Sequence, residues 1–196
     1  MDIMGFGETF LAILTGLGLS VACGFRVFIP PLIASIAAQT GYLELAESFQ
    51  WLGEWPTLIA LSIATVGDVI AHEFPVVDDV LNVVEAPLVP IAATILSVSL
   101  LTDMDPLLKW GLAAIAGGGS AGALHVARSF LKSLLNASTA GVSTPVVSLV
   151  EDAVAIVTPI LVILAPVFVL FLFLVVVGVT ALALKKWMGK RRQASA

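Results

Sequence analysis

Residues 151–192 read EDAVAIVTPILVILAPVFVLFLFLVVVGVTALALKKWMGKRR, and this stretch decides the class of protein. Its central part, Ala153–Leu184, contains no charged residue. Such a run predicts a membrane-crossing helix, because about 20 helical residues span the ~30 Å hydrocarbon core of a bilayer. The basic residues from Lys185 onward favour a cytoplasmic C-terminus. Glu151 and Asp152, at the other end, lie in an apolar stretch, where a carboxylate is costly unless it has a partner or faces water.

The composition excludes a soluble globular protein. Hydrophobic residues make up 59% of the 196 residues and charged residues 12%, whereas a soluble domain carries roughly 25% charged residues. Nucleic-acid binding is not expected, because basic side chains must track the phosphates and here they form a run only at the C-terminus, leading into a short basic tail at residues 188–196. We expect one integral membrane domain over residues 1–196, with the lipid bilayer and a small ion or solute as partners and no cofactor. The single cysteine, Cys23, excludes an intrachain disulfide and is expected to pack in the interior.

The apolar segments predict an all-α fold, a polytopic transmembrane helix bundle of about six to seven membrane segments. The predicted segments are Phe6–Cys23, Arg26–Thr40, Trp55–Ala71, Ala86–Leu101, Leu107–Phe130, Pro145–Val157 and Thr158–Leu184. Several are too short for a full crossing, and glycines and prolines interrupt them. We therefore expect broken or re-entrant helices around Gly24–Pro31, and a kink or break at Pro159 or Pro166.

The linkers carry further predictions. Trp51 and Trp55 fit an aromatic belt at the membrane interface. Residues 74–85 alternate valines with polar residues, which predicts a short amphipathic helix at the interface, its wet face formed by Asp78, Asp79, Asn82 and Glu85. The alternative is that these acids form a vestibule that attracts cations. Residues 136–144 predict a polar loop, with Asn136, Ser138 and Thr139 as candidate functional residues.

An internal repeat is one further hypothesis, with halves at residues 8–102 and 107–187. Each half has an arginine in an apolar segment, Arg26 or Arg128, followed by a helix that begins with a proline. Each of those helices has an aspartate, Asp68 or Asp152, seven residues before another proline. Transporters are often built from such repeats, with their sites near the membrane midplane.

The intramembrane charges are the strongest candidates for a site. Arg26 and Arg128 are expected either to form an anion site or to neutralise Asp68 and Asp152. The alternatives are structural pairing and snorkelling of the long side chains to the headgroups. Glu151 and Asp152 are expected one or two turns into a helix that starts near Pro145 and whose dipole favours carboxylates, but that does not explain two charges in an apolar segment.

Asp68 and His72 are four residues apart and share one face of a helix. An imidazole and a carboxylate in this arrangement can bind a transition metal or relay a proton, and His125 could join them from another helix. The alternative is an ordinary hydrogen-bonded histidine near the end of its helix.

Residues 117–119 are three successive glycines without the lysine of a phosphate loop. They predict close helix packing or local unwinding, and an exposed small-residue face there would favour a homo-oligomer. Serines and threonines are plentiful, but none has a recognisable nucleophile–base pattern. We therefore do not expect an enzyme.

Three groups of motifs resemble a known family. They are Gly24-Phe25-Arg26 followed by Pro30, then Pro75-Val76-Val77-Asp78, and then Asn136-Ala137-Ser138-Thr139 leading to Pro145 and Glu151-Asp152. With them the chain resembles, over nearly its whole length, the small bacterial multi-pass membrane family filed as domain of unknown function four-one-two-six. The resemblance implies a protein of the bacterial inner membrane and carries no established activity.

The first half of the chain departs from that family's pattern. The family tends to have Glu at the position of Asp68, Asp at the positions of His72 and Asn82, and a basic residue at the position of Ala86. The Gly-x-Arg, Ser-Thr-Gly and Glu-Asp elements match better, and the sites on them carry more weight.

These observations favour a small membrane transporter or channel for an ion or small polar solute. Glu151, Asp152, Asp68 and the arginines would line its pathway, and a buried carboxylate could couple transport to protons. The alternative is a scaffold that transports nothing and binds lipid or a partner protein, with its charges fixing the helix register.

Overall fold

The computed structural model describes residues 3–102, 104–139 and 144–165, and all regular structure in these ranges is helical. Its α-helices are α1 (Ile3–Cys23), α2 (Ile29–Gln39), α3 (Trp55–His72), α4 (Pro75–Leu100), α5 (Pro106–Leu112), α6 (Gly119–Thr139) and α7 (Thr144–Leu164). A short 3₁₀-helix, η1 (Glu47–Gly53), precedes α3. A π-helical segment, η2 (Ala113–Gly118), joins α5 to α6 in one continuous helical rod. The predicted all-α bundle is confirmed.

Prolines mark where the helices begin. A proline stands in the first turn of α2, α3, α4 and α5, where its missing N–H costs no hydrogen bond and its fixed φ suits the helix. Asp105 adds a side-chain cap to α5 by accepting from the backbone N–H groups of Leu107 and Leu108. The predicted break after Gly24 is confirmed, because α1 ends at Cys23 and α2 begins at Ile29.

Three predicted boundaries are wrong. Residues 74–85 are not a separate interfacial helix, since α4 continues from Pro75 through Pro87 and Pro90 to Leu100. The predicted boundary at Val157 is absent, because α7 continues through Pro159 and ends at Leu164, shortly before Pro166. The predicted loop at residues 136–144 is helical as far as Thr139. A proline inside a helix does not end it when neighbouring groups satisfy the carbonyl that loses its hydrogen bond, and α4 and α7 accordingly continue through their prolines.

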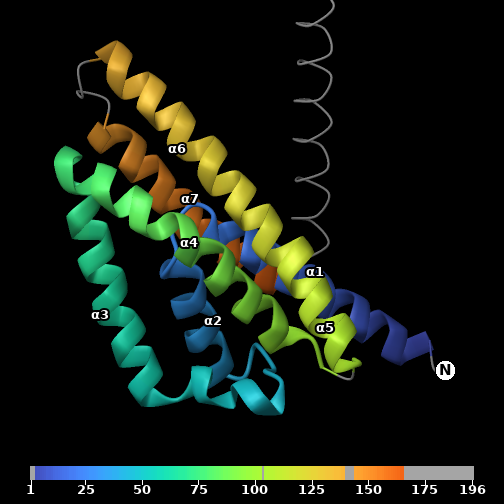
Figure 1. The fold of residues 1–196 in the computed structure, drawn as a ribbon. Coiled ribbons are helices and arrows are strands. Elements are labelled where there is room, and N and C mark those ends of the chain that lie inside the picture. The colour runs from blue at the N-terminus through green and yellow to red at the C-terminus, as the bar shows by residue number, and fades with distance from the viewer. Residues whose placement is uncertain (1–2, 103, 140–143, 166–196) are drawn as a thin grey trace, which may run out of the picture.

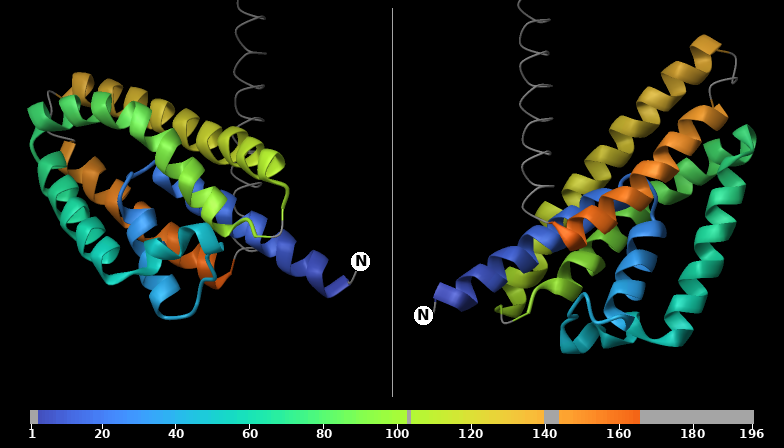
Figure 2. Two further views of the ribbon diagram at one scale, coloured as in Figure 1. Left: turned by 60° about the horizontal axis from the view of Figure 1, so that its bottom comes forward. Right: turned by 180° about the vertical axis from the view of Figure 1, so that it is seen from behind.

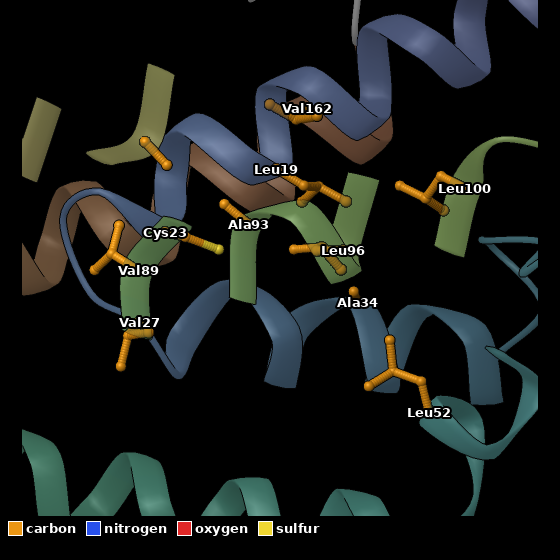
Figure 3. Close-up of a cluster of buried hydrophobic side chains, with 11 residues drawn as sticks. Leu19, Cys23, Val27, Ala34, Leu52, Val89, Ala93, Leu96, Leu100 and Val162 are labelled. Atoms are coloured by element: carbon orange, nitrogen blue, oxygen red, sulfur yellow. The ribbon is translucent and has the colours of Figure 1, made fainter. Parts of the chain in front are cut away.

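The helices surround an apolar core. Helices α1, α4, α6 and α7 run alongside one another, with α2 and α3 on one side of them (Figures 1 and 2). Side chains from α1, α2, α4 and α7 meet between these helices, among them Leu19, Ala34, Leu96 and Val162 (Figure 3). Cys23 is fully buried in the same cluster, as expected from the sequence.

The bundle is tightest where α1, α4 and η2 meet along small residues. We call Gly16, Ser20, Ala93, Ser97, Gly117 and Gly118 the small-residue seam. The Ser20 hydroxyl lies 2.5 Å from that of Ser97 and within hydrogen-bonding distance of the carbonyl of Ala93. A Cβ on Gly118 would lie 2.8 Å from the carbonyl oxygen of Pro90, so only glycine fits there. The glycines thus serve close packing inside the chain, and the expected exposure of this face to a second copy is wrong for Gly117 and Gly118, which are buried.

The outer surface is apolar in the way a lipid-facing surface is. On α3, Ile59, Ile63, Val66 and Ile70 share one face, and each is more than half exposed. Among the described residues, three helices are long and apolar enough to cross a membrane, namely Trp55–His72, Val80–Leu100 and Val146–Leu164. Apolar residues outside and charges inside are the reverse of a water-soluble helix, so the chain is a membrane protein. The number of crossings and the sidedness of the termini stay predictions.

Candidate functional site: a buried charge network

The charged residues of the interior gather at one end of the bundle. The end of α3, the start of α4, the end of α6 and the start of α7 meet there, at the upper left of Figure 1. In the described part of the chain, eight ordinarily charged side chains are at least nine-tenths buried: Arg26, Asp68, Asp78, Glu85, Arg128, Lys132, Glu151 and Asp152. We call these eight residues the buried charge network.

The network carries more acids than bases. Five of its members are carboxylic acids and three are basic, so with every group ionised it holds two negative charges in excess. Charges in an apolar interior are stable only when they are paired and hydrogen-bonded. The excess therefore has to be compensated, either by protons on the carboxylates or by a bound cation.

Arg26 contacts one aspartate from each half of the predicted repeat. Its side chain is fully buried, and its Nε lies 2.6 Å from an oxygen of Asp152 on α7. Its Nη1 lies 3.6 Å from Asp68 on α3. The predicted neutralisation of Asp68 and Asp152 by an arginine is thus the arrangement in the structure, with Arg26 serving both.

The turn that carries Arg26 is held by Gly24. A Cβ on Gly24 would lie 2.8 Å from the carbonyl oxygen of Ala121 and 3.0 Å from the side chain of Leu124, both on α6. Only glycine therefore allows this turn to press against α6. The carbonyl of Phe25, one residue later, accepts a hydrogen bond from Arg128. Gly24 thus packs the turn against α6, Phe25 contributes a backbone carbonyl to Arg128, and Arg26 contributes its side chain to the buried charge network.

Two cations on α6 reach the acids of α4 and α7. Arg128 donates to the side-chain oxygen of Asn82 at 3.0 Å and lies 3.6 Å from both Glu85 and Glu151. Lys132, one turn later, lies 2.7 Å from Asp78 and 3.5 Å from Glu151. Neither side chain snorkels outward, since both are buried. The pairing expected for Arg128 is the reading that the structure supports.

His72 lies at the centre of the acids. Its Nδ1 is 2.8 Å from the backbone carbonyl of Asp68, and because a carbonyl only accepts, this nitrogen carries the proton. The other ring nitrogen, Nε2, lies 3.6 Å from Glu85 and 3.7 Å from Asp78. Among the described residues, Nε2 has no hydrogen-bond partner, and neither has either carboxylate oxygen of Glu85.

His125 is engaged differently. Its Nε2 lies 3.2 Å from the carbonyl oxygen of Asn82, and its Nδ1 lies 3.5 Å from Arg128. Both of its nitrogens thus have partners, one as donor and one as acceptor. His125 does not complete a group with Asp68 and His72, as the sequence analysis allowed. Glu85 does so instead, since one ligand atom each from Asp68, His72 and Glu85 lies within 4.8 Å of the others.

A groove leads from the surface to this network. It has a volume of about 470 Å³ and lies between α4 and α6. Asp78 and Lys132 form its inner polar lining together with Asn82 and His125, while Val126 and Phe130 belong to its apolar rim. The groove therefore extends from the apolar outer surface to two members of the buried charge network, Asp78 and Lys132.

All eight residues that the sequence singled out for a polar site are buried and lie together at this end: Arg26, Asp68, His72, Asp78, His125, Arg128, Glu151 and Asp152. Glu85 and Lys132 are members of the buried charge network that were not predicted from the sequence. A signal was present, because Asp78, Asn82 and Glu85 recur at the spacing of one helix face, and Lys132 is one turn from Arg128.

The prediction that Asp78, Asn82 and Glu85 form a water-facing side of their helix is wrong. This side was expected to be wet, but Asp78 is 1% exposed and Glu85 2%, whereas Val80 and Val83 on the same helix are more than half exposed. The reason is tertiary, because the cations of α6 draw the acids inward and lipid accepts the valines. The side chains of Asn136, Ser138 and Thr139, proposed as loop residues, lie outside the described residues, as does that of Asp79.

The comparisons with known proteins identify the family of the chain. A protein-family model described as "Domain of unknown function (DUF4126)" matches residues 13–186. No curated protein and no solved structure matches the chain. The resemblance noted in the sequence is therefore confirmed over most of the chain: it belongs to the DUF4126 family of proteins.

Proposed function

We propose that the chain is a small membrane transporter or channel for an ion or small polar solute, with the buried charge network as its central site. We place it in the bacterial inner membrane, with the basic tail in the cytoplasm, and propose transport rather than catalysis. The observation that carries the proposal is the excess of two carboxylates in the interior of a membrane protein. Such groups are rare at membrane depth and mark ion paths and proton relays.

The groove between α4 and α6 supports the proposal. It brings the outer surface to within reach of Asp78 and Lys132, which also belong to the network. A cation that replaces Lys132 as the partner of Asp78 would free the amine to pair with Glu151 alone. Exchange of partners among buried charges is a route by which binding and proton release can be coupled.

A scaffold role is favoured by a different observation. Arg26, Arg128 and Lys132 each contact two acids from different helices. Such a network fixes the register of the helices and needs no transported species. The two proposals differ in one measurable property, which is flux.

The test is flux through purified protein in liposomes, with monovalent and divalent cations and a pH gradient. The variant Glu151→Gln/Asp152→Asn removes two carboxylates of the network, and Glu44→Gln/Glu47→Gln removes two exposed ones as a matched control. We expect flux in the wild type and the control and its loss in the network variant. Thermal unfolding and size-exclusion profiles show whether each protein is folded.

Should the network variant fail to fold, Glu85→Gln replaces it, since Glu85 has no hydrogen bond to lose among the described residues. Folded wild-type protein that passes none of the tested ions overturns the proposal for ions and favours the scaffold.

A further inference from the structure

The Nε2 nitrogen of His72 faces two acids at distances longer than a hydrogen bond. With Nδ1 donating to the carbonyl of Asp68, the neutral ring directs the lone pair of Nε2 toward Glu85 and Asp78. A lone pair that faces two carboxylates is repelled, and burial strengthens the repulsion. A proton or a cation between these atoms would remove the repulsion.

The spacing fits a metal ion better than a hydrogen bond. The distance from Nε2 of His72 to Oε1 of Glu85 is 3.6 Å, longer than a hydrogen bond. Two ligands that each lie about 2.1 Å from a shared tetrahedral ion are about 3.4 Å apart. Asp68 supplies a third ligand: one ligand atom each from Asp68, His72 and Glu85 lies within 4.8 Å of the other two, and Oδ1 of Asp68 lies 3.5 Å from Nδ1 of His72. The three side chains can therefore close around one ion with small movements of the carboxylates.

The surroundings have the features of a metal site. The ring N–H of His72 is fixed by a backbone carbonyl, as in most histidines that bind metals, and this leaves the other nitrogen free to coordinate. Arg26 and Arg128 lie 3.6 Å from oxygens of Asp68 and Glu85 and so orient these carboxylates. The excess of two negative charges in the network equals the charge of one divalent ion.

We propose that Asp68, His72 and Glu85 bind one divalent transition-metal ion, of the class of zinc, manganese or cobalt. One imidazole with two carboxylates suits this class, whereas oxygen ligands alone would favour magnesium or calcium. Three protein ligands would leave a coordination position open for water or for exchange. The inference names the substrate class for the proposed function and to that extent rests on it. The binding site itself is tested separately.

Binding is measured on purified protein in lipid nanodiscs, stripped with a chelator and dialysed against zinc or manganese ions. Elemental analysis gives the metal content, and titration with cobalt gives the affinity from its absorption bands. We expect about one ion per chain, and a loss of affinity of at least tenfold in His72→Gln and in Glu85→Gln. The matched controls are Glu47→Gln and Glu54→Gln, two exposed acids outside the buried charge network. Both controls should keep the wild-type affinity.

X-ray absorption of the zinc-loaded wild type keeps the proposal testable if the variants do not fold. One imidazole and oxygen ligands around the zinc support it, and a shell without imidazole overturns it. Wild-type protein that retains no metal, or a folded His72→Gln that binds as tightly as the wild type, also overturns it and leaves a proton as the compensating charge. Metal binding without flux keeps the site and rejects transport. Flux of other species without metal binding keeps transport and rejects this site.

Discussion

The rod formed by α5, η2 and α6 packs against α4 twice, by opposite means. At the small-residue seam, Gly117 packs against the side chain of Ser97, and Gly118 packs against the side chain of Thr94 and the backbone of Pro90. At the other end of the same helices, Arg128 and Lys132 fill the gap to Asp78 and Glu85 with long charged side chains.

The two regions are therefore sensitive to different kinds of substitution. Membrane helices associate through close contact of small residues and through polar contacts, because lipid is as apolar as a leucine side chain. Added side-chain volume destabilises the small-residue seam, whereas removal of one partner of an ion pair destabilises the buried charge network. The predictions below separate these two kinds of failure.

The largest effect is expected from Arg26→Gln. It leaves Asp68 and Asp152 buried without their shared cation, and breaking a buried ion pair costs about 3–5 kcal/mol. The free energy of unfolding in mixed micelles measures the loss. The triple variant Arg26→Gln/Asp68→Asn/Asp152→Asn should regain most of it, because no charge is then unpaired. If the single variant is as stable as the wild type, the network does not hold the helices together.

A smaller effect is expected from Asn82→Ala, which removes a neutral member of the charged end. Its side-chain oxygen accepts from Arg128 and from Ser129, and its amide donates to the carbonyl of Asp78. Loss of hydrogen bonds to a charged group costs about 1.5–3 kcal/mol. Ser133→Ala, at an exposed site on α6, is the control and should change the same free energy of unfolding by less than about 0.5 kcal/mol. Equal effects of the two variants would contradict the assignment.

Gly118→Ala tests the seam by adding one methyl group. The new carbon would press on Thr94 and lie 2.8 Å from the carbonyl oxygen of Pro90, which cannot move aside. Overpacking of this kind costs about 1–3 kcal/mol. Gly67→Ala, in the exposed face of α3 with nothing within 4 Å, should instead raise stability by up to about 1 kcal/mol. Thermal unfolding of both variants measures these changes. A Gly118→Ala variant as stable as the wild type would mean that the small-residue seam has room for a methyl group.

The smallest effect is a coupling between Gly117 and Ser97. A methyl group on Gly117 would overlap the hydroxyl of Ser97, which can rotate or be removed. Gly117→Ala should therefore cost less in a Ser97→Ala background than in the wild type, by at least about 0.5 kcal/mol. A double-mutant cycle on the free energy of unfolding measures this difference. Strictly additive losses would show that the two residues do not meet.

The sequence predicted most of the site's members but not their partners. Arg26, Asp68, Glu151 and Asp152 stood out because charges in apolar segments are costly wherever they lie. Glu85 and Lys132 did not, since they sit in stretches that also fit a wet helix face or a membrane boundary. Periodicity showed that Asp78, Asn82 and Glu85 share a face, but periodicity alone does not say whether that face meets water or protein.

The sequence by itself therefore determined the membrane class, the helical fold, the break at Gly24 and the family. These follow from local properties: runs of apolar residues, the missing Cβ of glycine and the fixed φ of proline. Only the tertiary structure decided that α4 is one helix with its acids inward and that Arg26 serves two aspartates. It also brought Glu85 to His72. The reason is physical, because the sign of a buried charge is known from the sequence, but the charge that compensates it comes from another helix, and its identity depends on which helices pack together.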